Sequence, residues 1–383
     1  MAGTVRKRTW TTRKGDVKTA WMVDYYDQNG ERHRETFPTQ KTAKDRLTDV
    51  SAEIKGGVHI PDSRSITVGE AAQLWLKRRK LERVERGSLR TYEQYVRLYI
   101  TPMIGKKKLA NLSAPFVEAF RDELLGRTSR TRAKSVLLAL RMVLSDMQRR
   151  GFTVQNVALP VRIKDSGRDE RPVEAGVDIP HKEEAQRLLQ HATGAARARF
   201  VTAVFTGLRA SELRGLFWSD VDFDRRTLSV RRRADWWGTI GRPKSKNGYR
   251  SIPMTPLLTN TLKEWRLACP HPKDGLDLVF PGRGGKVMNH TSLQAAFEEL
   301  QRSAGIVDAD GGPKYGLHAL RHFFASWGIE QGFSPKRLQT LMGHGSIKMT
   351  YDVYGHLFPQ PEDDHARFAA GEAALLGLKP VAG

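Results

Sequence analysis

Alternating apolar and polar residues near the N-terminus predict a small β-sheet. The stretches TAWMVDYYD and ERHRETFPT alternate in this way, and a Gln-Asn-Gly turn at residues 28–30 separates them; this pattern is typical of a β-hairpin within a three-stranded sheet. The next stretch, TQKTAKDRLTDVSAEIKGG, predicts a helix with Thr39 or Thr42 as its N-cap and the glycine pair at 56–57 as its end. Residues 1–57 are therefore expected to form one sheet and one helix.

Four stretches between Ile66 and Asp165 carry apolar residues at helical spacing, which predicts a four-helix bundle over residues 66–160. The stretches are AAQLWLKRRK, LRTYEQYVRLYI, PFVEAFRDELL and SVLLALRMVLSDMQRRG. Polar segments that contain proline flank this bundle at 58–66 and 164–180. We interpret both segments as linkers.

The remaining part of the chain mixes the two patterns. EEAQRLLQHA and ARARFVTAVFTGL predict helices, RTLSVRRR and YRSIPM predict strands, and further helices follow. The predicted fold class is mainly α with small antiparallel β-sheets. The predicted domains are 1–57, a module of sheet and helix; 66–160, a helical bundle; and 175–383, an α+β domain.

Net charge changes this picture because it indicates a polyanionic partner. The 383 residues include 64 Lys and Arg against 42 Asp and Glu, for a formal net charge of +22. The stretch from Ile66 to Asp165 alone holds 21 basic and nine acidic residues. Backbone phosphates recruit such side chains through counterion release, so nucleic acid is the favoured partner. A basic surface without a partner is the alternative.

Other features of the composition exclude several classes of protein. The single cysteine, Cys269, rules out a disulfide framework and a cysteine-based zinc site. No run of eighteen apolar residues occurs, and the N-terminus MAGTVRKRTW lacks the apolar run of a signal peptide. We therefore expect no membrane association and a cytoplasmic location.

One stretch near the C-terminus, MGHGSIKMTYDVYGHLF, concentrates four residues with chemical potential. These are His344, Tyr351, Tyr354 and His356, whose side chains can bind a metal or take part in catalysis. Imidazole and phenolate groups first suggest a metal site. Asp352 is the only carboxylate within the stretch, however, and no cysteine accompanies it. A metal centre is therefore disfavoured.

Two further motifs place basic residues near turns. TGLRASEL (206–213) has Arg209 after a glycine that ends an apolar helix, with Glu212 one helical turn later. GRPKSKNGYRSIPM (241–254) predicts a hairpin with Asn-Gly at 247–248 as its turn and Lys244 and Lys246 on its first arm. The two lysines would point to the same face of a strand, so the choice between them stays open.

The motif HALRH (318–322) puts His318 and Arg321 three residues apart, on one face if the segment is helical. These motifs resemble those of the tyrosine recombinase family, and more closely its phage-type integrases. TGLR-x-x-E-L, P-K-S-x-x-x-x-R-x-I-P, H-x-L-R-H and L-M-G-H…Y-G-H occur in family order. The resemblance also covers the two preceding domains, which are similar to the arm-binding sheet and the SAM-like core-binding bundle of such integrases.

The resemblance implies an active-site set and a role for each member. Arg209 and Arg321 would grip the non-bridging oxygens of a scissile phosphodiester, which suits paired guanidinium donors. His344 would donate a hydrogen bond to the phosphate, and Tyr354 would be the nucleophile. His318 is expected as the acid/base residue and Lys244 as the proton donor to the departing 5′ oxygen. Two neighbours receive lesser roles, Glu212 as an orienting carboxylate and Tyr351 as a packing residue.

The implied activity is cleavage and rejoining of double-stranded DNA at core and arm attachment sites through a 3′-phosphotyrosine intermediate. No cofactor is expected, because the phosphotyrosine conserves the energy of the broken bond. The resemblance also implies a homotetramer on DNA in a bacterial host, with a host DNA-bending protein and an excision factor as helpers. Two alternatives remain, a type IB topoisomerase-like enzyme and a non-catalytic DNA-binding regulator on the same scaffold.

The tail PQPEDDHARFAAGEAALLGLKPVAG follows the expected nucleophile. Pro359 and Pro361 end the preceding helix, and the acidic run 362–364 suits the start of a new helix. The apolar residues of that helix have no evident place in their own domain. By resemblance we expect the tail to dock on a neighbouring protomer; a helix folded back on its own domain is the alternative.

Overall fold

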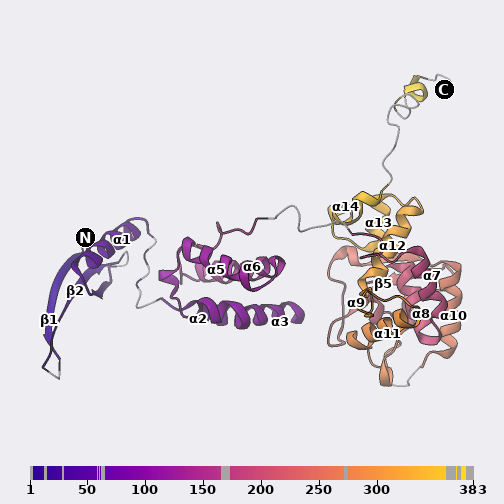
Figure 1. The fold of residues 1–383 in the computed structure, drawn as a ribbon, viewed down its shortest axis with the longest axis horizontal. Coiled ribbons are helices and arrows are strands. Elements are labelled where there is room, and N and C mark those ends of the chain that lie inside the picture. The colour runs from indigo at the N-terminus through magenta and orange to yellow at the C-terminus, as the bar shows by residue number, and fades with distance from the viewer. Residues whose placement is uncertain are drawn as a thin grey trace. The chain divides into compact units, whose positions relative to one another are not determined.

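The computed structural model describes residues 3–12, 15–27, 30–57, 59, 61, 65–164, 173–270, 275–358, 368 and 372–376. The chain divides into two compact units, Met1–Gly167 and Arg168–Gly383, and each is described by itself (Figure 1). Helices predominate, and the strands form small antiparallel sheets. The predicted fold class is thus confirmed. Within the described ranges no helix is both long and apolar enough to cross a membrane.

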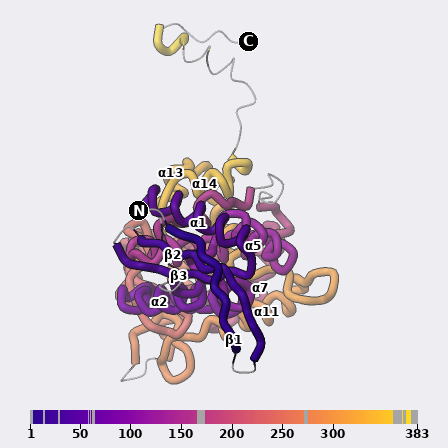
Figure 2. The backbone as a smooth tube through the Cα atoms, turned by 90° about the vertical axis from the view of Figure 1, so that its left-hand side faces the viewer, coloured from indigo at the N-terminus to yellow at the C-terminus, as the bar shows by residue number. Residues whose placement is uncertain are grey.

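The first unit begins with the predicted three-stranded sheet (Figure 2). Strand β1 (Thr4–Thr11) pairs with β2 (Val17–Tyr26), which pairs with β3 (Arg32–Phe37), both antiparallel. Helix α1 (Gln40–Lys55) follows, and its N-cap is Thr39, whose side chain accepts a hydrogen bond from the backbone N–H of Thr42. A small apolar cluster joins the sheet to the helix; its buried members are Val23, Tyr25, Ala43 and Val50.

The second part of this unit is the predicted helical bundle. Its helices are α2 (Val68–Leu81), α3 (Arg86–Tyr95), α4 (Thr101–Ile104), α5 (Ala114–Arg127) and α6 (Arg130–Arg149). One π-helical turn, Val96–Ile100, carries α3 into α4. The bundle has an apolar cluster of its own. The boundaries of three separate domains stay a prediction, because the chain divides into two units.

The second unit is mostly helical. Its helices are α7 (Lys182–His191), α8 (Gly194–Thr206), α9 (Ala210–Arg214), α10 (Pro256–Ala268), α11 (His290–Ser303), α12 (His318–Glu330), α13 (Pro335–Met342) and α14 (Ile347–Tyr354). One sheet has the strand order β4 (Val221–Asp222), β5 (Thr227–Val230), β8 (Arg250–Pro253). A two-stranded sheet pairs β6 (Arg233–Ala234) with β7 (Ile240–Gly241).

The hairpin predicted over residues 241–254 is wrong. Strand β7 pairs with β6 and β8 pairs with β5, so the two arms of the expected hairpin belong to different sheets. Asn247 and Gly248 lie in a 3₁₀ turn instead of a β-turn. The amide of Asn247 donates to the carbonyl oxygens of His344 and Gly345 at 3.1 and 3.2 Å. These bonds to a distant segment replace the local hairpin that the Asn-Gly pair suggested.

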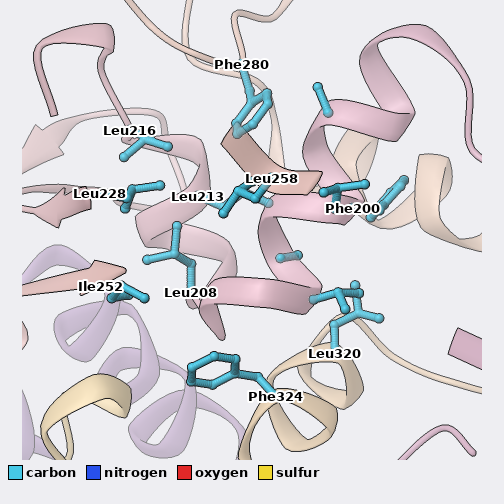
Figure 3. Packing of buried hydrophobic residues seen from close by; sticks show 14 of the residues in the cluster. Phe200, Leu208, Leu213, Leu216, Leu228, Ile252, Leu258, Phe280, Leu320 and Phe324 are labelled. Atoms are coloured by element: carbon cyan, nitrogen blue, oxygen red, sulfur yellow. The ribbon is translucent and has the colours of Figure 1, made fainter. Parts of the chain in front are cut away.

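The core of the second unit positions the segments that carry the candidate residues (Figure 3). Phe200 of α8, Ile252 of β8 and Phe324 of α12 belong to one buried apolar cluster. Figure 3 also shows Leu208 and Leu213, which flank Arg209 and anchor its segment in this cluster. In Figure 1 helices α12, α13 and α14 lie together. Packing therefore gathers segments as far apart in sequence as Arg209 and Tyr354.

Candidate active site

Arg209 lies in the short turn between α8 and α9. Helix α8 ends at Gly207, which adopts the left-handed conformation (φ 58°) that favours glycine. Arg209 is the N-cap of α9, and its backbone N–H donates to Glu212 Oε2 at 3.0 Å. Its guanidinium donates to Glu212 Oε1 at 2.8 Å and to the Gly343 carbonyl oxygen at 3.2 Å. The side chain is 35% exposed, so a phosphate can reach it from solvent.

Arg321 lies on α12 and is almost fully buried. Its guanidinium donates to the carbonyl oxygen of Gly207 at 2.6 Å and to that of Met342 at 2.5 Å. These bonds tie the end of α8 to the end of α13. Burial and the nearby charge of Arg209 lower the pKa of Arg321. Because His318 and Arg321 both lie on α12, the expected helix for the HALRH motif is present.

His344 follows the C-terminus of α13, where Gly343 adopts the left-handed conformation (φ 63°). The imidazole is buried, and its Nδ1 lies 2.9 Å from the Thr350 hydroxyl. Its ring lies parallel to that of Tyr354, with centroids 6.4 Å apart and an interplanar angle of 5°. Burial and the charges of the nearby arginines lower the pKa of His344 to about 3. His344 is therefore neutral at pH 7.

The two tyrosines of the C-terminal stretch have opposite environments. Tyr354 ends α14, is 2% exposed, and its hydroxyl lies 2.8 Å from His322 Nδ1. Burial raises the pKa of Tyr354 to about 12, although Arg321 and Arg209 oppose this rise. Tyr351 is 51% exposed, and its ring packs against Phe358. Tyr354 is thus the tyrosine that the fold directs toward the cluster of basic residues.

His318 lies beside His322, and Lys244 lies in the exposed loop before β8. The His318 ring is exposed and meets His322 edge-on, with centroids 4.8 Å apart. Partial burial lowers the pKa of His318, and the neighbouring His322 and arginines lower it further. Lys244 and Lys246 are both exposed, in the loop that Asn247 ties to His344. The choice between the two lysines stays open.

Two residues of this cluster were not assigned from the sequence. His322 is hydrogen-bonded to the Tyr354 hydroxyl. The resemblance had led us to expect His318 as the acid/base residue beside this tyrosine. Its position four residues after His318, on the same helix face, was the available signal. Arg250 is buried and donates to both carboxylate oxygens of Glu212 at 3.2 and 2.8 Å. Its place in the P-K-S-x-x-x-x-R-x-I-P motif marked it, but nothing in the sequence indicated its partner.

Comparison with known proteins finds relatives of this chain. Residues 181–360 match the phage integrase family, and residues 67–125 match the phage integrase N-terminal SAM-like domain. A tyrosine recombinase XerC-like protein of Caldanaerobacter subterraneus subsp. tengcongensis is 26% identical over 87% of this chain and 90% of its own length. The transposase from transposon Tn916 of Enterococcus faecalis is 30% identical over 39% of this chain and 40% of its own length.

Solved structures share the fold. The Tn1549 transposon integrase in complex with transposon right end DNA has a TM-score of 0.66 and 22% identity, covering 81% of this chain and all of that one. A λ integrase tetramer bound to a Holliday junction has a TM-score of 0.58 and 17% identity, and the match covers 88% of this chain and 95% of that one. Together, the fold and the family matches define a tyrosine recombinase, an enzyme that cleaves and rejoins DNA strands. The chain belongs to the phage integrase family.

Proposed function

We propose that this protein is the integrase of a mobile element and that Tyr354 is its nucleophile. The observation that carries the proposal is the geometry around Tyr354. Arg209 and Arg321 donate to the carbonyl oxygens of Gly343 and Met342, directly before His344, whose ring stacks on that of Tyr354. Relatives are named prophage integrase, integrase and transposase. Their names support a site-specific reaction on the DNA of mobile elements.

The proposed reaction needs no external energy. The Tyr354 hydroxyl oxygen forms a bond to phosphorus, and the bond from phosphorus to the 5′ oxygen breaks. The phenol proton passes to a neighbouring base. The hydrogen bond between His322 and the Tyr354 hydroxyl supports His322 in this role, and His318 is the other candidate. Lys244 gives a proton to the departing 5′ oxygen. A 5′-hydroxyl of the partner strand then attacks the phosphotyrosine and releases Tyr354.

The arginines supply the charge stabilisation in this proposal. The transition state concentrates negative charge on the non-bridging phosphate oxygens, and preorganised cationic donors stabilise that charge by several kcal/mol, about 3 for one donor. Arg209 and Arg321 are held by carbonyl oxygens of neighbouring segments, so they need little rearrangement. His344 completes the set as a hydrogen-bond donor to the phosphate.

The partners follow from the same proposal. The sheet and helix of residues 1–57 bind arm-type sites, the helical bundle and the second unit bind the core site, and four protomers assemble around two duplexes. A λ integrase structure is described as a tetramer bound to a Holliday junction, which supports such an assembly. A host DNA-bending protein and an excision factor complete the proposed set of partners.

The nucleophile is tested with a 5′-nicked suicide duplex that carries the attachment site, identified by sequencing the DNA that flanks the gene. Tyr354→Phe is expected to bind this duplex with wild-type affinity and to form no covalent adduct, because only the attacking oxygen is lost. The matched control, Tyr351→Phe, is expected to form the adduct. If the two variants exchange these phenotypes, the nucleophile is Tyr351.

The class of reaction needs a second assay. Wild-type protein should join strands between two duplexes that carry attachment sites. Adduct formation with relaxation of a single duplex and no joining would indicate a topoisomerase. Binding without any adduct would indicate a non-catalytic regulator.

A further inference from the structure

Arg250 begins β8 at a buried point where three segments of the second unit meet. Nη1 and Nη2 donate to Oε1 and Oε2 of Glu212, which is in the first turn of α9. Nε donates to the Leu341 carbonyl oxygen at 2.7 Å, and Nη1 donates to that of Gly248 at 3.1 Å. The side chain of Arg250 is 1% exposed and that of Glu212 is 4% exposed. One buried guanidinium thus connects α9, the loop before β8 and the last turn of α13.

Each connected segment carries a residue of the proposed active site. Arg209 shares the Glu212 carboxylate with Arg250, since its Nη1 donates to Oε1 at 2.8 Å. The loop before β8 contains Lys244. Three residues after Leu341 comes His344, whose carbonyl oxygen accepts from Asn247 of the same loop. Arg250 is therefore the common partner of all three segments.

The electrostatic balance of this cluster depends on Arg250. Burial acts to raise the pKa of the Glu212 carboxyl, but the hydrogen bonds and charge of Arg250, with a contribution from Arg209, outweigh it and bring the pKa to about 2. A bidentate pair of this kind fixes geometry as well as charge. Without Arg250, the buried carboxylate would keep Arg209 as its remaining cationic partner and would compete with a phosphate for it.

We propose that Arg250 is a positioning residue of the recombinase, which fixes Arg209, the Lys244 loop and His344 relative to one another without touching the scissile phosphate. The inference rests on the proposed function, because it needs those residues to act on DNA. Displacements of about 1 Å in a catalytic group can lower a rate about a hundredfold. Arg250 is expected to affect the chemical step and to leave DNA binding intact.

The test uses full-length protein and the nicked attachment-site duplex in single-turnover assays. Arg250→Met removes the charge and all four hydrogen bonds but keeps an unbranched side chain. We expect adduct formation to fall at least about a hundredfold and the affinity for the duplex to change less than about threefold. Arg250→Lys keeps the charge, so its rate of adduct formation should lie between those of Arg250→Met and the wild type. The matched control is Arg197→Met, which removes a half-buried arginine bonded to the Leu189 carbonyl oxygen and should cleave like wild type.

A double variant separates positioning from simple packing. Glu212→Gln combined with Arg250→Met removes both charges, so no unpaired carboxylate remains to hold Arg209. We expect the double variant to form the adduct at least about tenfold faster than Arg250→Met alone, as coupled charges are non-additive. A residue that only fills space would make the double variant slower than either single variant. If Arg250→Met does not fold, the rates of adduct formation of Arg250→Lys and of the double variant are compared with the wild-type rate instead.

The outcomes also separate this inference from the proposed function. Wild-type cleavage by Arg250→Met and Arg250→Lys, equal losses of binding and cleavage, or no recovery in the double variant would overturn the positioning role and leave the recombinase assignment intact. If wild-type protein binds the duplex and forms no adduct, the proposed function itself fails.

Discussion

His344 is a buried, uncharged imidazole surrounded by arginines. Its pKa of about 3 in the folded protein compares with an ordinary value of about 6.5, so the unfolded chain takes up a proton first as the pH falls. The contribution of neutral His344 to the unfolding free energy is fully present above about pH 6.5. It is lost as the pH falls from there toward 3. The site is therefore arranged for a neutral His344 until a phosphate arrives.

This arrangement predicts a pH dependence of stability. Between about pH 7 and about pH 5, protonation of His344 in the unfolded state should cost the wild-type protein about 2 kcal/mol of unfolding free energy. His344→Gln lacks this titration and should lose about 2 kcal/mol less over the same interval. Urea unfolding at the two pH values measures the difference. Equal pH dependence in the two proteins would contradict a depressed pKa.

Sequence reasoning named most of the residues that the structure brings together in the candidate site, but not all of their contacts. The resemblance, through the Y-G-H motif, singled out Tyr354. The structure buries Tyr354 and exposes Tyr351 on the same helix. The bonds of His322 and Arg250 were not predictable, because their partners lie 32 and 38 residues away in sequence and on other elements. Such contacts depend on how helices pack, which local spacing does not encode.

Among the elements, the turn from α13 to α14 is tightly packed beside the site. A Cβ atom at Gly343 would lie 2.9 Å from Arg250 Nη1 and 2.9 Å from the Asn247 carbonyl oxygen. Gly332, which follows α12, has a similar backbone conformation, with φ of 77° against 63°, and open space around it. The two glycines therefore separate backbone strain from close packing.

Alanine at these two positions should have different effects. Gly332→Ala is expected to cost about 1 kcal/mol of stability, the strain of a left-handed residue with a Cβ. Gly343→Ala adds the collision and should cost at least about 2 kcal/mol, with slower adduct formation because Arg250 and Asn247 shift. Thermal unfolding and the suicide-duplex assay measure the two effects. Equal losses for both variants would show that the α13–α14 turn can relax.

The elements also show where sequence patterns are reliable. Helices α6 and α8 were predicted because apolar residues recur at helical spacing within their own sequences. The hairpin at 241–254 was mispredicted because an Asn-Gly pair signals a turn only when the flanking strands pair with each other. Here the strands pair with β5 and β6, and Asn247 bonds to the segment after α13.

On the scale of the whole molecule, basic residues are distributed over separate parts of the chain. In β1 the residues Arg6, Lys7 and Arg8 are exposed, and the bundle carries its own excess of basic residues. The sheet with α1 and the bundle have separate apolar clusters. This arrangement supports the prediction that the N-terminal part contacts DNA independently of the rest.

A chain shortened to begin at Ser63 tests this division of labour. It should bind and cleave the core site but lose binding to distal arm sites, as measured by footprinting. Its affinity should also fall less steeply with salt, because each lost phosphate contact lowers the slope of log affinity against log salt by about 0.9. Arm-site protection by the shortened chain would refute the assignment of residues 1–57.

The predicted docking of the C-terminal tail stays a prediction. Its expected breaking prolines and acidic start, residues 359–364, lie outside the described part of the chain. Among the described tail residues, Phe368, Leu375 and Leu376 are exposed. They are therefore available to the neighbouring protomer on which we expect the tail to dock.

The enclosed hydroxyl of Tyr354 has a consequence for when the enzyme is reactive. An uncharged phenol with a pKa of about 12, bonded to His322 and shielded from solvent, is a poor nucleophile toward any ester that meets the protein by chance. Reactivity has to be conferred, by contacts that expose the oxygen and bring a phosphate beside the arginines. If Tyr354 is the nucleophile, as proposed, the DNA-free protein is a latent enzyme that becomes reactive only when its DNA substrate binds.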